Sequence, residues 1–235
     1  LQLEQPILAQ VAIGTGYTES KWVSEQIIRH AVDETSLKAV IVRVGQLCGA
    51  SGGAWSLHEW FPSMVQSALT LRCFPSDSRN ISWIPLELAS SALVALRRSS
   101  VSSSVIHLIH PRPVPWSTVA DVISSELSVP LVPYADWLEE LGRSIEPTKN
   151  GQQANTVDAL TDIALLRDIR ALRLLPFYKN LSKATGGDAL GFSTLSMSQA
   201  LSCLPALSAT NSQLTPGDVK VWLSQWRKEG LFFHA

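Results

Sequence analysis

The sequence comprises 235 residues, 46% of them hydrophobic and 17% charged, which is enough apolar material for one large core or for one domain with a small lobe. The 19 Lys and Arg nearly cancel the 20 Asp and Glu, and the resulting net charge of -1 excludes a broad basic surface for nucleic acid. Three cysteines without a Cys-x-x-Cys spacing argue against a disulfide framework or a zinc knuckle. No apolar run approaches the roughly 18 residues of a membrane span, and no secretory signal pattern is present. We therefore expect a cytoplasmic protein without a membrane partner.

The first elements along the chain form a helix followed by a buried strand. Val23, Ile27 and Ala31 recur at helical spacing, which predicts an amphipathic helix over residues 17–33. Residues 38–44 form a β-branched run that is typical of a strand buried in a parallel sheet. A helix leading into such a strand is half of a βαβ unit. We next expect a glycine-rich loop over residues 45–55 and a helix over residues 59–71. An extended segment over 81–85, a helix over 86–98 and a strand over 105–109 follow.

The chain changes character after residue 112. Helices are expected, one of them capped by Ser117, over residues 117–127, 135–141, 156–175 and 216–229. A polar linker is expected over residues 146–155. The overall prediction is an α/β fold in which residues 1–112 carry the strands and residues 113–235 form a mostly helical lobe.

One candidate catalytic motif is Tyr17-x-x-x-Lys21 at the start of the first helix. A spacing of four places both side chains on one helix face, one turn apart. The ammonium of Lys21 can then stabilise the phenolate of Tyr17, which lets the tyrosine exchange a proton with a carbonyl or alcohol oxygen. An ordinary surface pair is the alternative. The amphipathic helix and the buried strand that follow favour the catalytic interpretation.

A second candidate is Gly49-Ala50-Ser51-Gly52-Gly53, which matches the Gly-x-Ser-x-Gly nucleophile elbow of hydrolases. Asp77 with His107 or His110 could complete a triad around Ser51. The elbow requires a helix immediately after the serine, and Gly52-Gly53 opposes helix initiation. We therefore favour a glycine-rich loop that lets the backbone approach a ligand.

Other signals for a cofactor or metal are weak. Gly14-Thr15-Gly16 lacks the third glycine of a dinucleotide fingerprint, because Glu19 stands at that position. The histidines lack metal-ligand spacing, so no metal site is predicted. Trp55, Trp60 and Trp83 could wall a pocket, although core packing is the favoured interpretation.

The motifs together resemble the thioester reductase domains of non-ribosomal peptide synthetases, adenylate-forming reductases, carboxylic acid reductases and α-aminoadipate reductases. These domains belong to the extended short-chain dehydrogenase/reductases. The resemblance begins with Gly-Tyr-Thr-Glu-Ser-Lys-Trp-Val-Ser-Glu over residues 16–25. It continues in order through residues 41–49, 53–55, 59–62, 82–85, 107–117 and 218–230.

The resemblance implies the C-terminal part of a Rossmann-type parallel sheet, followed by a helical substrate-binding lobe. It implies NADPH as the hydride donor and a carrier-bound phosphopantetheine thioester as the substrate, released as an aldehyde or alcohol. Tyr17 would protonate the developing oxyanion, and Lys21 would hold the nicotinamide ribose. Val44, Gly45 and Gln46 would run beside the nicotinamide, and residues 49–53 would form a flexible pocket loop.

The sequence departs from the family pattern at its start. Relatives place a glycine-rich nucleotide loop far upstream of the tyrosine, and only a short segment precedes Tyr17. We therefore expect a partner Rossmann half upstream and incomplete cofactor binding by this chain alone. Two alternatives stay open: a non-redox module that binds a carrier protein or acyl-pantetheine, and a serine hydrolase that uses Ser51.

Overall fold

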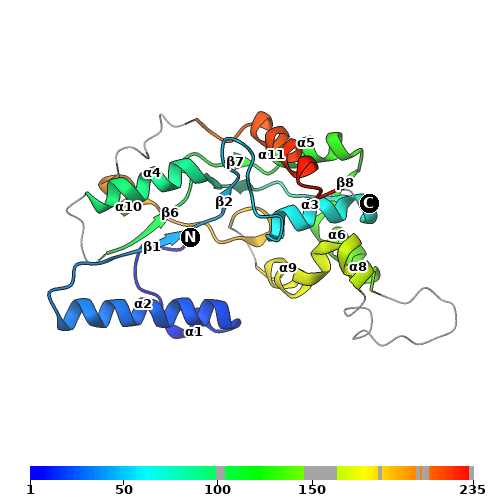
Figure 1. The fold of residues 1–235 in the computed structure, drawn as a ribbon. Coiled ribbons are helices and arrows are strands. Elements are labelled where there is room, and N and C mark those ends of the chain that lie inside the picture. Colours follow the sequence, from blue (N-terminus) through cyan, green and yellow to red (C-terminus); the bar gives the residue numbers. More distant parts are fainter. Residues whose placement is uncertain (99–103, 146–162, 185–186, 205–206, 208–211, 233–235) are drawn as a thin grey trace. The chain divides into compact units, whose positions relative to one another are not determined.

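The computed structural model describes residues 1–98, 104–145, 163–184, 187–204, 207 and 212–232. The chain divides into two compact units that interleave along the sequence (Figure 1). Unit 1 comprises residues 1–47, 82–112 and 194–212, and unit 2 comprises residues 48–81, 113–193 and 213–235. The expected division at residue 112 into a reductase core and a substrate lobe remains a prediction about function.

Unit 1 is built on the parallel pair β1 (Val40–Val44) and β6 (Ser104–Leu108). The register joins Ile41 to Val105 and Arg43 to His107. Its remaining elements are α1 (Ala9–Ala12), α2 (Gly16–Glu34), β5 (Ile84–Pro85), α4 (Leu86–Arg97) and α10 (Ser198–Cys203). The short strand β2 (Leu47–Cys48), which pairs with β5, leads from this unit into the next.

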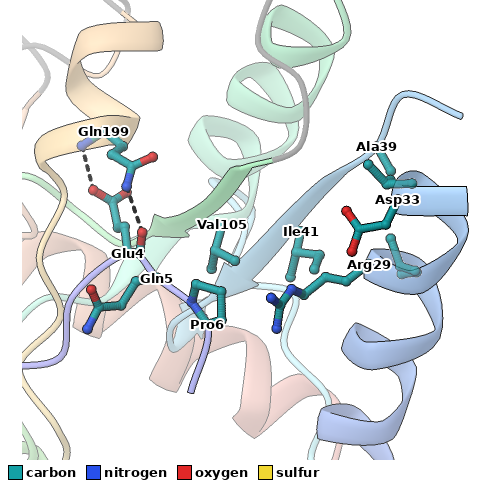
Figure 2. Close-up of a pocket in the computed structure, with 11 residues that line it drawn as sticks. Glu4, Gln5, Pro6, Arg29, Asp33, Ala39, Ile41, Val105 and Gln199 are labelled. Atoms are coloured by element: carbon teal, nitrogen blue, oxygen red, sulfur yellow. Dashed lines mark hydrogen bonds between the residues drawn. The ribbon is translucent and has the colours of Figure 1, made fainter. Parts of the chain in front are cut away.

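Side-chain alternation gives the β1–β6 pair two different faces. Val40 and Val42 pack against a buried cluster to which α4 and α10 contribute. Ile41 points to the opposite face, where residues of α2 lie (Figure 2). Helices α4 and α2 accordingly lie on opposite sides of the strands (Figure 1). This layering is that of a parallel sheet covered on both faces.

Unit 2 is mainly helical, with short strand pairs. Its helices are α3 (Trp60–Leu71), α5 (Ser117–Leu127), α6 (Tyr134–Arg143), α8 (Ile163–Asp168), α9 (Leu175–Ser182) and α11 (Pro216–Lys228), with 3₁₀ turns at η1 (Arg170–Leu174) and η2 (Ala189–Gly191). Strand β3 (Phe74–Ser76) pairs in parallel with β8 (Leu131–Pro133), and β4 (Asn80–Ile81) pairs antiparallel with β7 (Val114–Pro115).

The core of unit 2 is aromatic. Phe61 is fully buried, and its ring lies 5.3 Å from that of Trp55 and 6.0 Å from that of Trp226, measured between centroids. The Trp60 ring meets Phe61 edge to face, with 5.6 Å between the centroids. Trp55, Trp60 and Trp83 are all at least nine-tenths buried, which confirms that these residues pack in cores.

The α/β fold class predicted from the sequence is confirmed by the parallel strand pairs. Two details were wrong. Trp116 is the N-cap of α5, without a side-chain cap, and its carbonyl accepts from the amides of Val119 and Ala120, so Ser117 lies inside the helix. The expected helix over 156–175 is broken at Ile169 into α8 and η1, and its first part lies outside the described residues, as does the expected linker.

None of the helices in the described part of the chain is long and apolar enough to cross a membrane.

Candidate functional site

The site predicted from the sequence begins at the N-terminus of α2. Thr15 is the N-cap, and its Oγ1 accepts a hydrogen bond from the amide of Thr18 at 3.2 Å. Glu19 Oε1 accepts from the amide of Gly14 at 3.2 Å, so a carboxylate also occupies this end of the helix. The hydroxyl of Thr18 donates to the carbonyl of Ala12 at 2.6 Å, which ties the helix start to α1. The first turn is therefore capped by the chain's own groups.

Tyr17 and Lys21 lie one turn apart, as their spacing predicts. The Lys21 ammonium sits over the Tyr17 ring, 5.5 Å from its centroid. Tyr17 is 71% exposed, and Lys21 is also exposed, so a ligand can reach both side chains. The pair is therefore arranged to combine a proton donor with a neighbouring positive charge.

Val44, Gly45 and Gln46 follow directly at the end of β1. Val44 is 42% exposed, and the Gly45 amide donates to the carbonyl of Leu108 at 3.0 Å. A Cβ on Gly45 would come within 2.4 Å of Ile109 Cγ2, so the chain can turn here only without a side chain. Gln46 Nε2 donates to the carbonyl of Leu47 at 2.6 Å. This segment leaves the sheet as a tightly packed turn with an exposed valine at its edge.

An ion pair that the sequence analysis missed connects α2 to β1. Arg43 Nε donates to Glu25 Oε1 at 2.8 Å, and Arg43 Nη2 donates to Glu25 Oε2 at 2.6 Å. Both side chains are only 15% exposed. An arginine inside an otherwise apolar strand requires a partner, and this rule is the signal that could have found the pair.

The ion pair also shows how α2 runs along β1. Ala39 and Ile41 line a cavity with Arg29 and Asp33, whereas Arg43, further along the strand, meets Glu25 on an earlier turn of the helix. The helix and strand are thus antiparallel. Moving back four residues from Glu25 to Lys21 covers about 6 Å, and moving on two residues from Arg43 covers about 6.6 Å. From this spacing we expect Lys21 to lie level with the Val44–Gln46 segment, within unit 1.

A cavity of about 370 Å³ lies beside this ion pair (Figure 2). Its apolar lining includes Ile41 and Val105, and Arg29 reaches towards Pro6. Glu4 is 4% exposed and accepts hydrogen bonds from the amides of His107 and Ala200 at 2.9 and 3.0 Å. Glu4 is therefore committed to holding the strand and α10 together, and none of the predicted site residues lines the cavity.

His107 is a fully buried histidine beneath this region. Its Nδ1 lies 2.9 Å from the carbonyl oxygen of Ser196, and its Nε2 has no hydrogen-bond partner among the described residues. Burial lowers the pKa of His107, and the charge of Arg43 adds to this effect. The Ser196 carbonyl, Glu4 and Glu25 oppose the shift without overcoming it. The imidazole therefore favours its neutral form in the folded chain.

This lowered pKa predicts that the free energy of unfolding falls as the pH drops. In the unfolded chain His107 takes up a proton near its ordinary pKa of about 6.5, while the folded chain resists protonation until a lower pH. The stabilisation is thus complete above about pH 6.5 and is lost progressively below it. His107→Asn should show a smaller loss between about pH 7.5 and pH 5 than the native chain in urea denaturation. His30→Asn, at an exposed histidine, is the control, and an unchanged pH slope in His107→Asn would contradict the prediction.

The nucleophile-elbow interpretation of Ser51 is wrong. Helix α3 begins only at Trp60, so the strand–serine–helix turn of an elbow is not formed. The Asp77 carboxylate accepts from Arg79 Nη2 at 2.6 Å and from the Leu190 amide at 2.9 Å. Burial alone would raise the pKa of Asp77, but these hydrogen bonds and the charge of Arg79 lower it. His110 Nδ1 and Nε2 lie 3.0 and 3.1 Å from the carbonyl oxygens of Arg112 and Ser212. Asp77 and His110 are therefore already held by other hydrogen-bond partners.

The loop over residues 49–53 is packed against α11, and this packing disagrees with the flexible pocket loop that the resemblance implied. Gly49 and Gly53 are both buried. Gly53 has φ +84°, and a Cβ there would lie 2.7 Å from the carbonyl oxygen of Val221. Gly49 approaches the Trp222 ring equally closely. The glycines therefore allow close backbone packing.

A matched pair of substitutions tests this packing. Gly53→Ala should lower the free energy of unfolding by about 1–3 kcal/mol, because the new methyl group meets backbone and the positive φ disfavours alanine. Gly52→Ala is the control, since no heavy atom lies within 4 Å of its added Cβ. Urea denaturation should show a change within about 0.5 kcal/mol for the control. Equal effects of both substitutions would refute the packing argument.

The residues present fit one end of a dinucleotide better than the other. Tyr17, Lys21 and Val44 are exposed on unit 1 and could contact a ribose and a nicotinamide. The Gly14–Gly16 segment does not suit a phosphate, because Glu19 already places a carboxylate on the Gly14 amide. Within the described residues, no group of three or more potential metal ligands is present.

Comparison with known proteins identifies relatives of this chain. A family model of NAD-binding proteins, described as Male sterility protein, matches residues 4–93 and implies a nucleotide cofactor. An adenylate-forming reductase of Heterobasidion annosum is 38% identical over 97% of this chain and 21% of its own length. An adenylate-forming reductase of Serpula lacrymans is 31% identical over 95% of this chain and 20% of its own length. The chain thus spans about a fifth of the curated relatives it matches.

A solved structure shows the same fold. The terminal reductase domain from the myxalamid biosynthetic pathway has a TM-score of 0.72 and 21% sequence identity. The match covers 98% of this chain and 54% of that domain. The chain is therefore a relative of the adenylate-forming reductases with the fold of a terminal reductase domain, as the resemblance predicted.

Proposed function

We propose that the chain is the C-terminal part of an NADPH-dependent thioester reductase. The complete enzyme would release an acyl or peptidyl group from a phosphopantetheinylated carrier protein as an aldehyde or alcohol. An upstream Rossmann half would bind the adenosine and phosphates, and the cytoplasm would be its location. The observation that carries the proposal is the exposed Tyr17–Lys21 pair on a chain related to adenylate-forming reductases, and the Glu25–Arg43 contact supports its expected place beside Val44–Gln46.

Each side chain has a role that its position allows. When bound, the cofactor supplies the hydride. The Tyr17 hydroxyl donates a proton to the oxygen of the reacting carbonyl, where negative charge develops. Lys21 donates hydrogen bonds to the ribose hydroxyls, and its charge stabilises the Tyr17 phenolate after proton transfer. Val44, Gly45 and Gln46 would lie beside the nicotinamide, with the exposed Val44 side chain at this edge.

The proposal is tested at two levels. In the isolated chain, titration with NADPH should shift the NMR signals of Tyr17, Lys21 and Val44–Gln46, even if binding is weak. A chimera in which this chain replaces the matching segment of the Heterobasidion annosum reductase should oxidise NADPH in the presence of an acyl-pantetheine thioester. Lys21→Met should weaken NADPH binding by about tenfold or more, whereas Lys220→Met, at an exposed lysine on α11, should not.

Failure at both levels would overturn the proposal. No NADPH-dependent shift at these residues and no thioester-dependent oxidation by the chimera would exclude a reductase role. Binding of an acylated carrier protein under those same conditions would instead support a non-redox module.

A further inference from the structure

Helix α2 carries the proposed proton donor, yet apolar packing holds it only weakly. None of its residues is fully buried. Val23 and Ile27 of its apolar stripe are 49% and 64% exposed, and Ala31 is half-buried. Trp22 Nε1 donates to the carbonyl of Ile7 at 3.0 Å, and this bond connects the helix only to the segment that precedes it. Something other than a hydrophobic interface must therefore set the position of α2 along the sheet.

The Glu25–Arg43 pair has the geometry to do so. Two parallel hydrogen bonds join the carboxylate to the guanidinium, and a bidentate pair of this kind fixes distance and orientation together. Arg43 Nη1 also donates to the carbonyl of Gln5 at 3.0 Å, so the guanidinium is held on a second side. Because both side chains are 15% exposed, solvent screens the interaction only partly. The fork thus holds one turn of α2 to one residue of β1.

The consequence for the site follows from spacing. Tyr17, Lys21 and Glu25 recur every four residues and share one face of α2. Arg43 stands immediately before Val44, Gly45 and Gln46. A shift of α2 by one residue would move Lys21 and Tyr17 by about 1.5 Å along the strand and rotate them by about 100°. Displacements of about 1 Å in a reacting group can cost roughly 10²-fold in rate.

We propose that Glu25 and Arg43 are positioning residues that set the register of α2 on β1, and with it the placement of Tyr17 and Lys21 beside Val44–Gln46. The catalytic consequence rests on the proposed reductase function, whereas the structural part does not. The pair touches neither cofactor nor substrate in this arrangement. It acts through the helix that carries the proton donor.

The structural part is tested on the full chain without any ligand. A nitroxide attached at Lys21→Cys, in a Cys203→Ser background, should broaden the methyl signals of a Val44 labelled with ¹³C. Glu25→Gln, which keeps the shape of the side chain, should reduce this broadening. The double variant Glu25→Arg with Arg43→Glu, which reverses the pair, should restore it. Asp33→Asn removes a carboxylate from the same helix and should change nothing.

Two results would overturn the proposal. The first is unchanged broadening in Glu25→Gln. The second is a failure of the reversed pair to restore the broadening. Restoration by the reversed pair is needed because Glu25→Gln could also reduce the broadening simply by unfolding the helix. Arg43→Lys keeps the positive charge but loses the two parallel hydrogen bonds of the guanidinium. Its Val44 broadening should therefore lie between that of the native pair and that of Glu25→Gln.

The catalytic part is read in the chimera. Glu25→Gln should lower kcat by about 10–10²-fold with little change in KM. Adding Glu25→Gln to Tyr17→Phe should lower kcat no further, because the pair acts through Tyr17. If Glu25→Gln lowers kcat in the Tyr17→Phe background as much as it does in the unmodified chimera, the pair does not act through Tyr17. If the chimera is inactive and NADPH causes no shifts in the isolated chain, the reductase proposal fails, while the nitroxide experiment still decides the role of the pair.

Discussion

Tyr17→Phe is expected to lower thioester reduction by the chimera about 10²–10⁴-fold, which is the usual contribution of a positioned general acid. The phenylalanine keeps the ring beneath Lys21 and removes only the hydroxyl. Because the hydroxyl acts on the substrate oxygen, KM for NADPH should change little. The rate of NADPH oxidation at saturating thioester measures the effect.

Tyr134→Phe provides the matched control. The Tyr134 hydroxyl donates to the carbonyl of Tyr178 at 3.0 Å in unit 2, so its loss removes a structural hydrogen bond. Turnover by this variant should stay within about threefold of the unmodified chimera. If Tyr17→Phe also stays within that range, Tyr17 is not the proton donor.

Phe61→Ala is expected to lower the free energy of unfolding by about 3–5 kcal/mol. Phe61 is fully buried, and its ring meets those of Trp55, Trp60 and Trp226 at centroid distances of 5.3, 5.6 and 6.0 Å. Truncation leaves a cavity among large rigid rings that cannot collapse into it, so the lost contacts are not replaced. Urea denaturation followed by tryptophan fluorescence reports directly on this cluster.

Val221→Ala is the control for this substitution. Val221 lies on α11 and is 41% exposed, so its truncation should change stability by no more than about 0.5 kcal/mol. A loss below about 1 kcal/mol for Phe61→Ala would mean that the aromatic cluster tolerates the cavity, and that it is not the main source of stability in unit 2.

Helices with strong periodicity could be predicted from the sequence because local physics decides them. Helix α2 has its cap at Thr15, and α11 begins with a capping box between Thr215 and Asp218. The β-branched run of β1 excludes a helix by its rotamer restrictions. The elements observed at these places agree closely with those expected.

Other features depend on contacts between distant segments. Strand β8 has only three residues and forms because it pairs with β3, far away in the sequence. The break between α8 and η1 is stabilised by the buried Gln66 side chain on α3. Its Nε2 donates to the carbonyl of Asp168 at 3.1 Å, and its Oε1 accepts from the amide of Arg170 at 3.1 Å. Neither contact leaves a local signal, which is why one unbroken helix was expected over residues 156–175.

The candidate site divides in the same way. The residue types and the four-residue spacing of Tyr17 and Lys21 are written in the sequence, since a helix places such residues on one face in any context. How far along β1 this helix face lies, and so whether it reaches Val44–Gln46, is a tertiary property. It depends on the contact between Glu25 on α2 and Arg43 on β1. Likewise, the glycines at 49–53 predicted a loop. That this loop packs closely against α11 is visible only in the tertiary structure. Local sequence determines which element forms, whereas long-range contacts determine where each element lies.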